Sequence, residues 1–118
     1  MMSEVLLAQT NLLDYIKNNN VHRIAGIGAS ISTTYLITQF DLGELINKLF
    51  DDDPRKINRF APVTGLEVCA LSQLDFRNFD CVIILAWQHT NKLLDRLKDV
   101  GYKGKILIPL PHFRIIEI

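Results

Sequence analysis

The chain has 118 residues, 48% of them hydrophobic and 22% charged, a size and composition that predict one compact domain over residues 1–118. Its 13 Lys and Arg residues balance its 13 Asp and Glu residues, so no basic excess favours nucleic-acid binding. The longest apolar run, residues 81–87, is far shorter than the roughly 20 residues of a membrane-spanning helix, so we expect no membrane role.

The N-terminal part of the chain predicts a helix, a strand, a second helix and a second strand. Ser3 is a candidate N-cap, and the apolar residues after it recur at helical spacing until residues 18–20. Residues 21–27 are short, apolar and followed by glycines, which predicts a buried strand. A helix over about residues 30–40 and a strand over residues 45–50 follow, and that strand ends in an acidic turn.

The middle of the chain lacks a helical period. Residues 55–63 carry a proline and mixed charges, which indicates a loop that leads into a short strand near Val63 or Val68. A helical turn is expected at residues 72–74. Residues 81–86 are the most apolar segment of the chain, which is typical of a central strand covered on both faces of a sheet.

The C-terminal part predicts one amphipathic helix and one more strand. Over residues 89–100, leucines and a valine form an apolar side while charged residues form the opposite side. Gly101 is the candidate C-cap of this helix. Residues 105–108 predict a last parallel strand, and residues 114–118 predict a short apolar tail.

Strands that alternate with helices predict the α/β class, here a small Rossmann-like three-layer domain with a mostly parallel sheet of about five strands. In such a sheet, ligands bind outside the carboxyl ends of the strands, near the point where the strand order reverses. The loops after four strands should therefore face one crevice. Its candidate ligand-binding residues are Gly26, Gly28, Ala29, Ser30, Asp51, Asp52, Trp87, Gln88, His89 and His112.

Gly26 and Gly28 match two positions of the dinucleotide-binding fingerprint, in which glycines form a tight turn and let the backbone approach a phosphate at a helix N-terminus. Ile31 occupies the third glycine position, and its branched side chain prevents the close packing that this glycine allows. Two interpretations stay open. The turn either contacts a phosphate or nucleotide, or it is a tight strand-to-helix turn without a ligand.

An acidic turn follows the second predicted strand. In dinucleotide sites, the carboxylate that bonds the ribose hydroxyl follows the glycine turn by about 20 residues. Asp51 follows Gly28 at close to this separation. The Asp-Asp-Asp-Pro sequence is also typical of an ordinary turn, in which Pro54 holds Asp53 extended and water surrounds the other two carboxylates. The turn therefore predicts either ligand contact by Asp51 or Asp52, or a solvated turn.

Trp87 directly follows the most apolar strand, so its flat surface could stack on a base or a sugar. Gln88 and His89 add two hydrogen-bonding side chains at the same place. In the alternative interpretation, Trp87 packs in the core and Gln88 or His89 begins the next helix. His112 and Arg114 fit a phosphate-facing role and simple solvent exposure equally well.

No catalytic set stands out in the sequence. The hydroxyl residues after the glycine turn have no identifiable histidine and acid partners. Cys69 and Cys81 are too few for a disulfide framework or a zinc site and are expected as small buried residues. The three histidines form no metal-ligand pair at helical spacing, so we expect no metal. The N-terminus has no basic stretch, which predicts a cytoplasmic protein.

Five segments together resemble the C-terminal domain of sugar C-methyltransferases, which act on nucleotide-linked deoxysugars. The resemblance covers nearly the whole chain, and it departs from the family pattern after the glycine turn, where residues 31–34 lack the usual lysine and glycine. Gln88 also stands where the family tends to have Asn. The segments are residues 24–30 (IAGIGAS), 50–56 (FDDDPRK), 81–87 (CVIILAW), 108–111 (IPLP) and 114–116 (RII).

The resemblance implies a three-part enzyme with a zinc-binding N-terminal segment, a middle S-adenosylmethionine domain and this C-terminal domain, which helps to enclose the sugar nucleotide. We expect no cofactor in this chain, because S-adenosylmethionine would be bound only by a missing domain or a partner. The chain alone should not transfer methyl groups. It would be part of a longer protein, a separately encoded partner of a methyltransferase, or a relict with another use.

Three functional hypotheses follow from the sequence. The first is a module that binds a nucleotide-diphosphate sugar, with a methyltransferase partner chain or a second copy as its partner. The second is a protein–protein docking or oligomerisation subunit with an empty crevice, which the three isoleucines of residues 115–118 favour. The third, an independent NAD-type oxidoreductase, has the least support, because it lacks a substrate domain and the third glycine.

Overall fold

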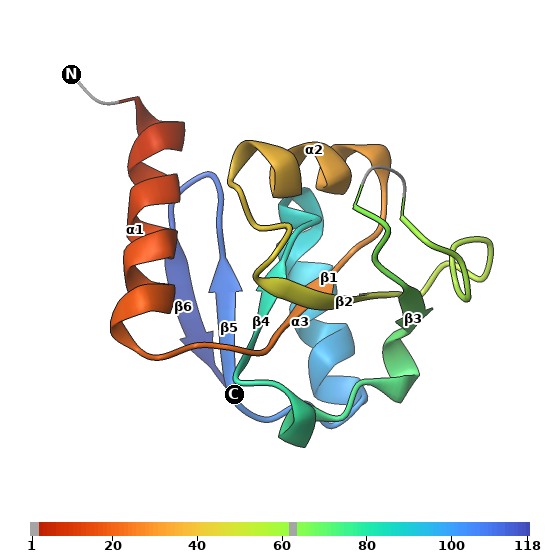
Figure 1. The fold of residues 1–118 in the computed structure, drawn as a ribbon. Helices are drawn as coiled ribbons and strands as arrows, with labels where there is room; N and C mark the ends of the chain where they lie inside the picture. The colour runs from red at the N-terminus through yellow and green to blue at the C-terminus, as the bar shows by residue number, and fades with distance from the viewer. Residues whose placement is uncertain (1–2, 62–63) are drawn as a thin grey trace.

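The computed structural model describes residues 3–61 and 64–118, and within them six strands form one sheet in the order β3-β2-β1-β4-β5-β6 (Figure 1). The elements in chain order are α1 (Glu4–Asn18), β1 (Ile24–Ile27), α2 (Ile31–Gln39), β2 (Ile46–Asp51), β3 (Val68–Ala70), η1 (Leu71–Gln73), η2 (Phe76–Asn78), β4 (Cys81–Ile84), η3 (Trp87–His89), α3 (Thr90–Asp99), β5 (Lys105–Ile108) and β6 (Arg114–Glu117).

Five of these strands run parallel, and β6 alone among the described strands runs antiparallel to its neighbour β5. This sheet confirms the α/β prediction and has the strand order of a Rossmann fold. The prediction of a short apolar tail was wrong, because these residues form the sixth strand. A turn after β5 reverses the chain and places Ile116 beside Ile106. A short terminal run contains too little alternation of apolar and polar residues to predict a strand.

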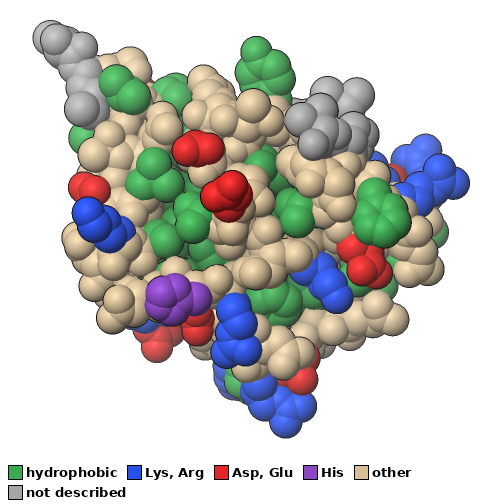
Figure 2. All heavy atoms as spheres, in the orientation of Figure 1, with side chains coloured by type: hydrophobic (Ala, Val, Ile, Leu, Met, Phe, Trp, Pro, Cys, Tyr) green, Lys and Arg blue, Asp and Glu red, His purple; other side chains and the backbone are tan. Residues whose placement is uncertain are grey.

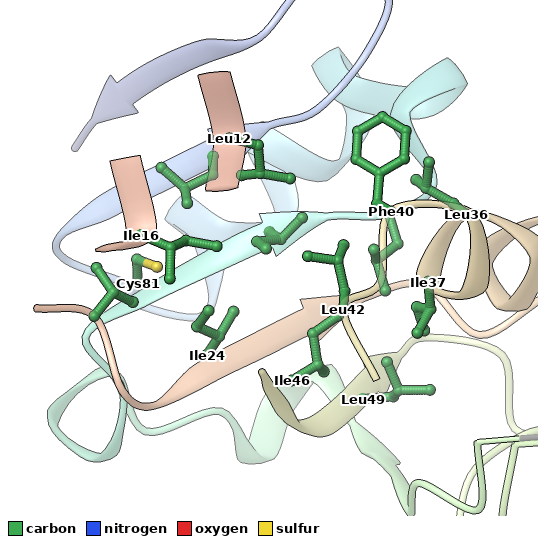
Figure 3. Packing of buried hydrophobic residues seen from close by; sticks show 14 of the residues in the cluster. Leu12, Ile16, Ile24, Leu36, Ile37, Phe40, Leu42, Ile46, Leu49 and Cys81 are labelled. Carbon is green, nitrogen blue, oxygen red and sulfur yellow. The ribbon is translucent and has the colours of Figure 1, made fainter. Parts of the chain in front are cut away.

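Alternate residues of the strands point to opposite faces of the sheet and build two hydrophobic cores. Ile24, Leu49 and Ile83 pack with the helices α1 and α2 on one face, and Figure 3 shows Leu12 of α1 and Phe40, the C-cap of α2, approaching the same strands. The opposite core contains alternate strand residues together with Leu97 of α3. These are the three layers expected from the sequence, with α1 and α2 on one side and α3 on the other.

The helices begin and end close to the predicted residues, because their caps are local. Ser3 accepts a hydrogen bond from the Leu6 N–H at 3.1 Å and caps α1, whose buried residues Ala8 and Leu12 lie one turn apart. The predicted C-cap of α3, Gly101, was wrong by one residue, since the C-cap is Val100. Gly101 lies one residue beyond, with φ of 83°, the left-handed conformation that commonly follows a helix.

The connection from β2 to β3 contains no described helix. The Asn58 N–H donates to the Val68 carbonyl, and the Val68 N–H donates to the Arg59 carbonyl, so this arm is tied to the edge of the sheet. The predicted short strand begins at Val68, whereas Val63, the other predicted position, lies outside the described residues.

The space-filling view shows acidic and basic side chains interspersed over the face with α1 and α2, in keeping with the zero net charge (Figure 2).

No described helix combines the length and the apolar character that crossing a membrane requires.

β1 is shorter than predicted, because it begins at Ile24 and not at Val21. Val21 instead donates its N–H to the Ile16 carbonyl at the end of α1. The entry to β1 is therefore shaped by the preceding helix.

Asp80 fixes this entry loop from the other side. The backbone N–H groups of His22 and Arg23 donate to Asp80 Oδ2 at 2.8 and 2.9 Å, and these bonds hold the pKa of the carboxyl below its usual value. A carboxyl with a lowered folded-state pKa stabilises the fold above its unfolded pKa of about 3.9, and the contribution disappears as the pH falls through the folded-state pKa.

We predict that Asp80→Asn, which mimics the protonated carboxyl, lowers the free energy of unfolding at pH 7 by at most about 1 kcal/mol, because the side chain is exposed. The difference from the wild type should shrink as the pH falls below the ordinary carboxyl pKa of about 3.9 toward the lowered folded-state pKa. Urea denaturation at pH 7 and at a series of acidic pH values measures it, with Asp14→Asn, an exposed position on α1, as the control. A difference that persists unchanged at low pH would contradict the role of the charge.

Candidate functional site

A crevice of about 780 Å³ opens at the carboxyl ends of β1, β2 and β4. It lies at the topological switch point, because the strands that follow β1 in the chain are placed on its two sides. The residues that line it are Ile27, Gly28, Ala29, Ser30, Phe50, Asp51, Asp52, Asp53, Pro54, Lys56, Leu71, Ala86, Gln88, His89, Lys92 and Leu93. Three of the four loops that the sequence placed at one crevice, those after β1, β2 and β4, thus line it, whereas the loop after β5 does not.

The crevice combines apolar and polar lining. Ile27, Phe50, Leu71 and Leu93 come from the core on the α3 side or pack against it. Carboxylates, an amide, an imidazole and two ammonium groups supply the polar part, from Asp51, Asp52, Asp53, Gln88, His89, Lys56 and Lys92. A flat apolar group and an anionic or hydroxyl-bearing group can therefore both be accommodated.

Gly28 makes the turn that follows β1 possible. Its φ is +109°, and a Cβ atom on it would lie 2.9 Å from Ala86 Cβ and 3.2 Å from the Ala86 backbone nitrogen. Gly26 has a different structural role from Gly28, because it is buried inside β1 and does not line the crevice. A Cβ atom there would lie 2.7 Å from Leu49 Cδ2 and 2.8 Å from Leu85 Cδ1, so this glycine serves core packing.

The backbone amides of the glycine turn donate within the chain. The Gly28 N–H donates to the Phe50 carbonyl at 2.8 Å, and the Ala29 N–H donates to Asp51 Oδ2 at 2.9 Å. The Ser30 N–H donates to Thr33 Oγ1 at 2.8 Å in a capping box that begins α2. Of the two interpretations of this turn, the geometry favours the tight turn over a phosphate cradle built from these amides.

Each carboxylate of the acidic turn has a partner. Asp51 accepts from the Ala29 N–H with one oxygen and from the Asp53 N–H, at 2.8 Å, with the other, so it joins the glycine turn to the acidic turn. Asp52 accepts two bonds from Arg96 of α3, at 2.8 and 3.1 Å, and this guanidinium holds the pKa of Asp52 below its usual value. Hydrogen bonds from Arg55 lower the pKa of Asp53 to about 2.

Trp87 lies beside the crevice and not in it. It is half-buried and packs against the core on the α1 and α2 side. It also lines a second hollow of about 430 Å³, together with Leu110, Pro111 and Arg114. Gln88 and His89, which follow it in η3, line both hollows. Core packing, one of the two sequence interpretations of Trp87, is therefore present, while stacking of its ring on a base or a sugar stays a prediction.

The remaining predicted residue lies apart from the others. His112 is exposed in the turn between β5 and β6 and lines neither hollow. The sequence reasoning also missed residues that line the crevice, above all Lys56 and Lys92. Lys92 stands three positions after His89, one helical turn along the start of α3, and this spacing was the available signal. Helical periodicity alone had placed it on the solvated side.

Metal ligands do not cluster among residues 3–61 and 64–118, where no group of three His, Cys, Asp or Glu side chains is placed to hold an ion. Both cysteines are free and buried, as expected. Burial raises the pKa of the Cys81 thiol to about 12 and also raises that of Cys69, so both thiols stay protonated at neutral pH.

The family described as C-methyltransferase C-terminal domain matches residues 3–111 of the chain. Among solved structures, UDP-D-quinovosamine 4-dehydrogenase from Vibrio fischeri is similar, with a TM-score of 0.52 and 14% sequence identity over 81% of this chain and 92% of that chain. At this identity the likeness concerns the fold alone. No curated protein matches the chain by sequence.

Proposed function

The chain belongs to the C-methyltransferase C-terminal domain family, and from this premise we propose that it binds the nucleotide-diphosphate sugar, or otherwise serves as the accessory domain, in a sugar C-methyltransferase system. The observation that carries the proposal is the crevice at the switch point, which joins an apolar lining to two lysines and an acidic turn. The chain has no catalytic role of its own in this proposal.

The charges of the crevice favour an anion. Arg96 pairs with Asp52 and Arg55 pairs with Asp53, whereas Lys56 and Lys92 form no ion pair within 4.0 Å in the described part of the chain. These two ammonium groups outnumber Asp51, the one carboxylate of the acidic turn without a basic partner among the described residues. Because the amides of the glycine turn are already used, the two ammonium groups are the charged donors available to a diphosphate. The apolar lining accepts the base, and a ribose hydroxyl donates to a free lone pair of Asp51.

The same charges fit poorly with S-adenosylmethionine, whose sulfonium group is a cation and which carries no phosphate. Lys56 and Lys92 would repel such a group in the crevice. We therefore assign the methyl donor to another domain or another chain. In this scheme the present residues bind and orient the sugar nucleotide, and the methyl group arrives from outside the crevice.

Thermal unfolding of the purified chain with candidate ligands tests the proposal, because a ligand that binds only the folded state raises its midpoint. The ligands are thymidine, uridine and guanosine diphosphate sugars, S-adenosylmethionine and NAD. We expect a rise with at least one diphosphate sugar and none with S-adenosylmethionine. If no diphosphate sugar raises the midpoint, the result would count against a sugar-nucleotide site.

We predict that Lys92→Met weakens binding of that diphosphate sugar about tenfold, the loss expected for one charge-assisted hydrogen bond to a phosphate. The matched control is Lys98→Met, because Lys98 lies on the same helix and does not line the crevice. Isothermal titration calorimetry at two salt concentrations measures both variants. Equal losses in the two variants would show that only the overall charge matters.

Oligomerisation is the second candidate function, favoured by an apolar surface on α1. Val5, Leu6 and Leu7 are 40%, 47% and 51% exposed at the start of this helix. The C-terminal isoleucines support it less than expected, because Ile116 packs against the α3-side core. If a second copy covers α1, sedimentation should show a dimer that Leu7→Glu dissociates. A wild-type monomer at all concentrations would contradict this candidate.

A further inference from the structure

The second hollow, of about 430 Å³, adjoins the crevice. It lies between the start of α3 and the turn that leads from β5 to β6, where Leu110, Pro111 and Arg114 form one side. Gln88, His89 and Lys92 line both this hollow and the crevice, so they form a shared border. A ligand in the crevice that extends past this border therefore enters the second hollow.

The polar side chains of this hollow have unused hydrogen-bonding capacity. Within the part of the chain that the structure describes, Gln88, Asn91 and Arg114 have no side-chain hydrogen bond or ion pair. The acidic turn differs, because Asp51 and Asp52 are engaged by the chain itself. The hollow thus offers two amides and a guanidinium to a ligand, and these groups provide both donors and acceptors.

Its other lining is apolar. Trp87 is half-buried, and Leu110 and Pro111 lie across from the start of α3 in the same hollow. A pyranose ring has apolar C–H faces and a rim of hydroxyl groups, so it suits an aromatic side chain flanked by hydrogen-bonding side chains. The flat apolar faces of a nucleobase suit the larger crevice, where Ile27 and Leu71 supply apolar lining.

We propose that the sugar of the nucleotide sugar occupies this second hollow, against Trp87 and within reach of Asn91 and Arg114, while the nucleoside occupies the crevice. This inference rests on the proposed function and assigns each half of that ligand to a place. Lys92, which lines both hollows, then binds the diphosphate that joins the two halves.

Comparing each nucleoside diphosphate with its glucose conjugate tests the inference. The probes are thymidine, uridine and guanosine diphosphate and their glucose conjugates, titrated calorimetrically into the wild type and Arg114→Met. We expect Arg114→Met to weaken the conjugate about tenfold and the free diphosphate less than about twofold, because only the sugar contacts Arg114. Arg23→Met is the control, since Arg23 is exposed ahead of β1 and lines neither hollow.

The single tryptophan of the chain provides an independent readout, because Trp87 borders the second hollow and does not line the crevice. The conjugate should change its fluorescence at saturation, and the free diphosphate should not. If Arg114→Met weakens both ligands equally or neither, or if both ligands change the fluorescence alike, the sugar does not occupy this hollow although the crevice site stands. If the wild type binds none of the probes, the proposed function fails and this inference fails with it.

Discussion

Gly28→Ala is expected to lower the free energy of unfolding by about 3 kcal/mol and to abolish ligand binding in the crevice. The φ of +109° at Gly28 is a conformation that residues with a side chain rarely adopt. A Cβ atom would also press on the Ala86 Cβ and backbone nitrogen at 2.9 and 3.2 Å, and a backbone atom cannot move aside as a flexible side chain can. The turn must therefore shift, and the crevice wall shifts with it.

Urea denaturation followed by Trp87 fluorescence measures the loss, and Gly43→Ala is the matched control. No atom lies within 4 Å of a Cβ atom built on Gly43, and its φ is outside the left-handed region. This substitution should be neutral or stabilise the protein by up to about 1 kcal/mol, because alanine restricts the unfolded chain. Similar losses for both variants would contradict the strain and crowding assigned to Gly28.

Asp51→Ala is expected to lower the free energy of unfolding by about 2 kcal/mol, because it leaves two amides of the crevice wall without their charged acceptor. The Ala29 and Asp53 N–H groups donate to its two oxygens at 2.9 and 2.8 Å. Their loss separates the glycine turn from the acidic turn. Water can reach this half-buried site, so the cost stays below that of a fully buried orphaned group.

Denaturation measures this loss, and hydrogen exchange locates it. We expect the amides of Ala29 and Asp53 to exchange faster in Asp51→Ala, while amides in the middle of α1 change only with the global stability. Asp99→Ala serves as the control, since its carboxylate is exposed and lies 3.7 Å from Arg96. Unchanged protection at Ala29 would show that Asp51 does not hold the glycine turn in solution.

Local patterns in the sequence determined the elements and their class. The N-cap at Ser3, the helical spacing of Ala8 and Leu12, and the apolar run that becomes β4 each act within a few neighbouring residues. Such signals can be recognised in the sequence before the fold is known, because helix capping and side-chain periodicity depend on the local backbone. Alternation of these elements then predicts a parallel sheet and the edge at which its loops gather.

Only the tertiary structure decided how the side chains at that edge are used. Asp52 pairs with Arg96 across 44 residues of sequence, and Asp51 accepts from Ala29 across 22, so two carboxylates that looked available for a ligand also stabilise the chain. Lys92 became a candidate ligand contact only when the fold placed it beside the two hollows, and the fold alone decided that Arg114 borders the second of them. Distant pairings of this kind are set by packing of the whole sheet, and no local pattern in the sequence records them.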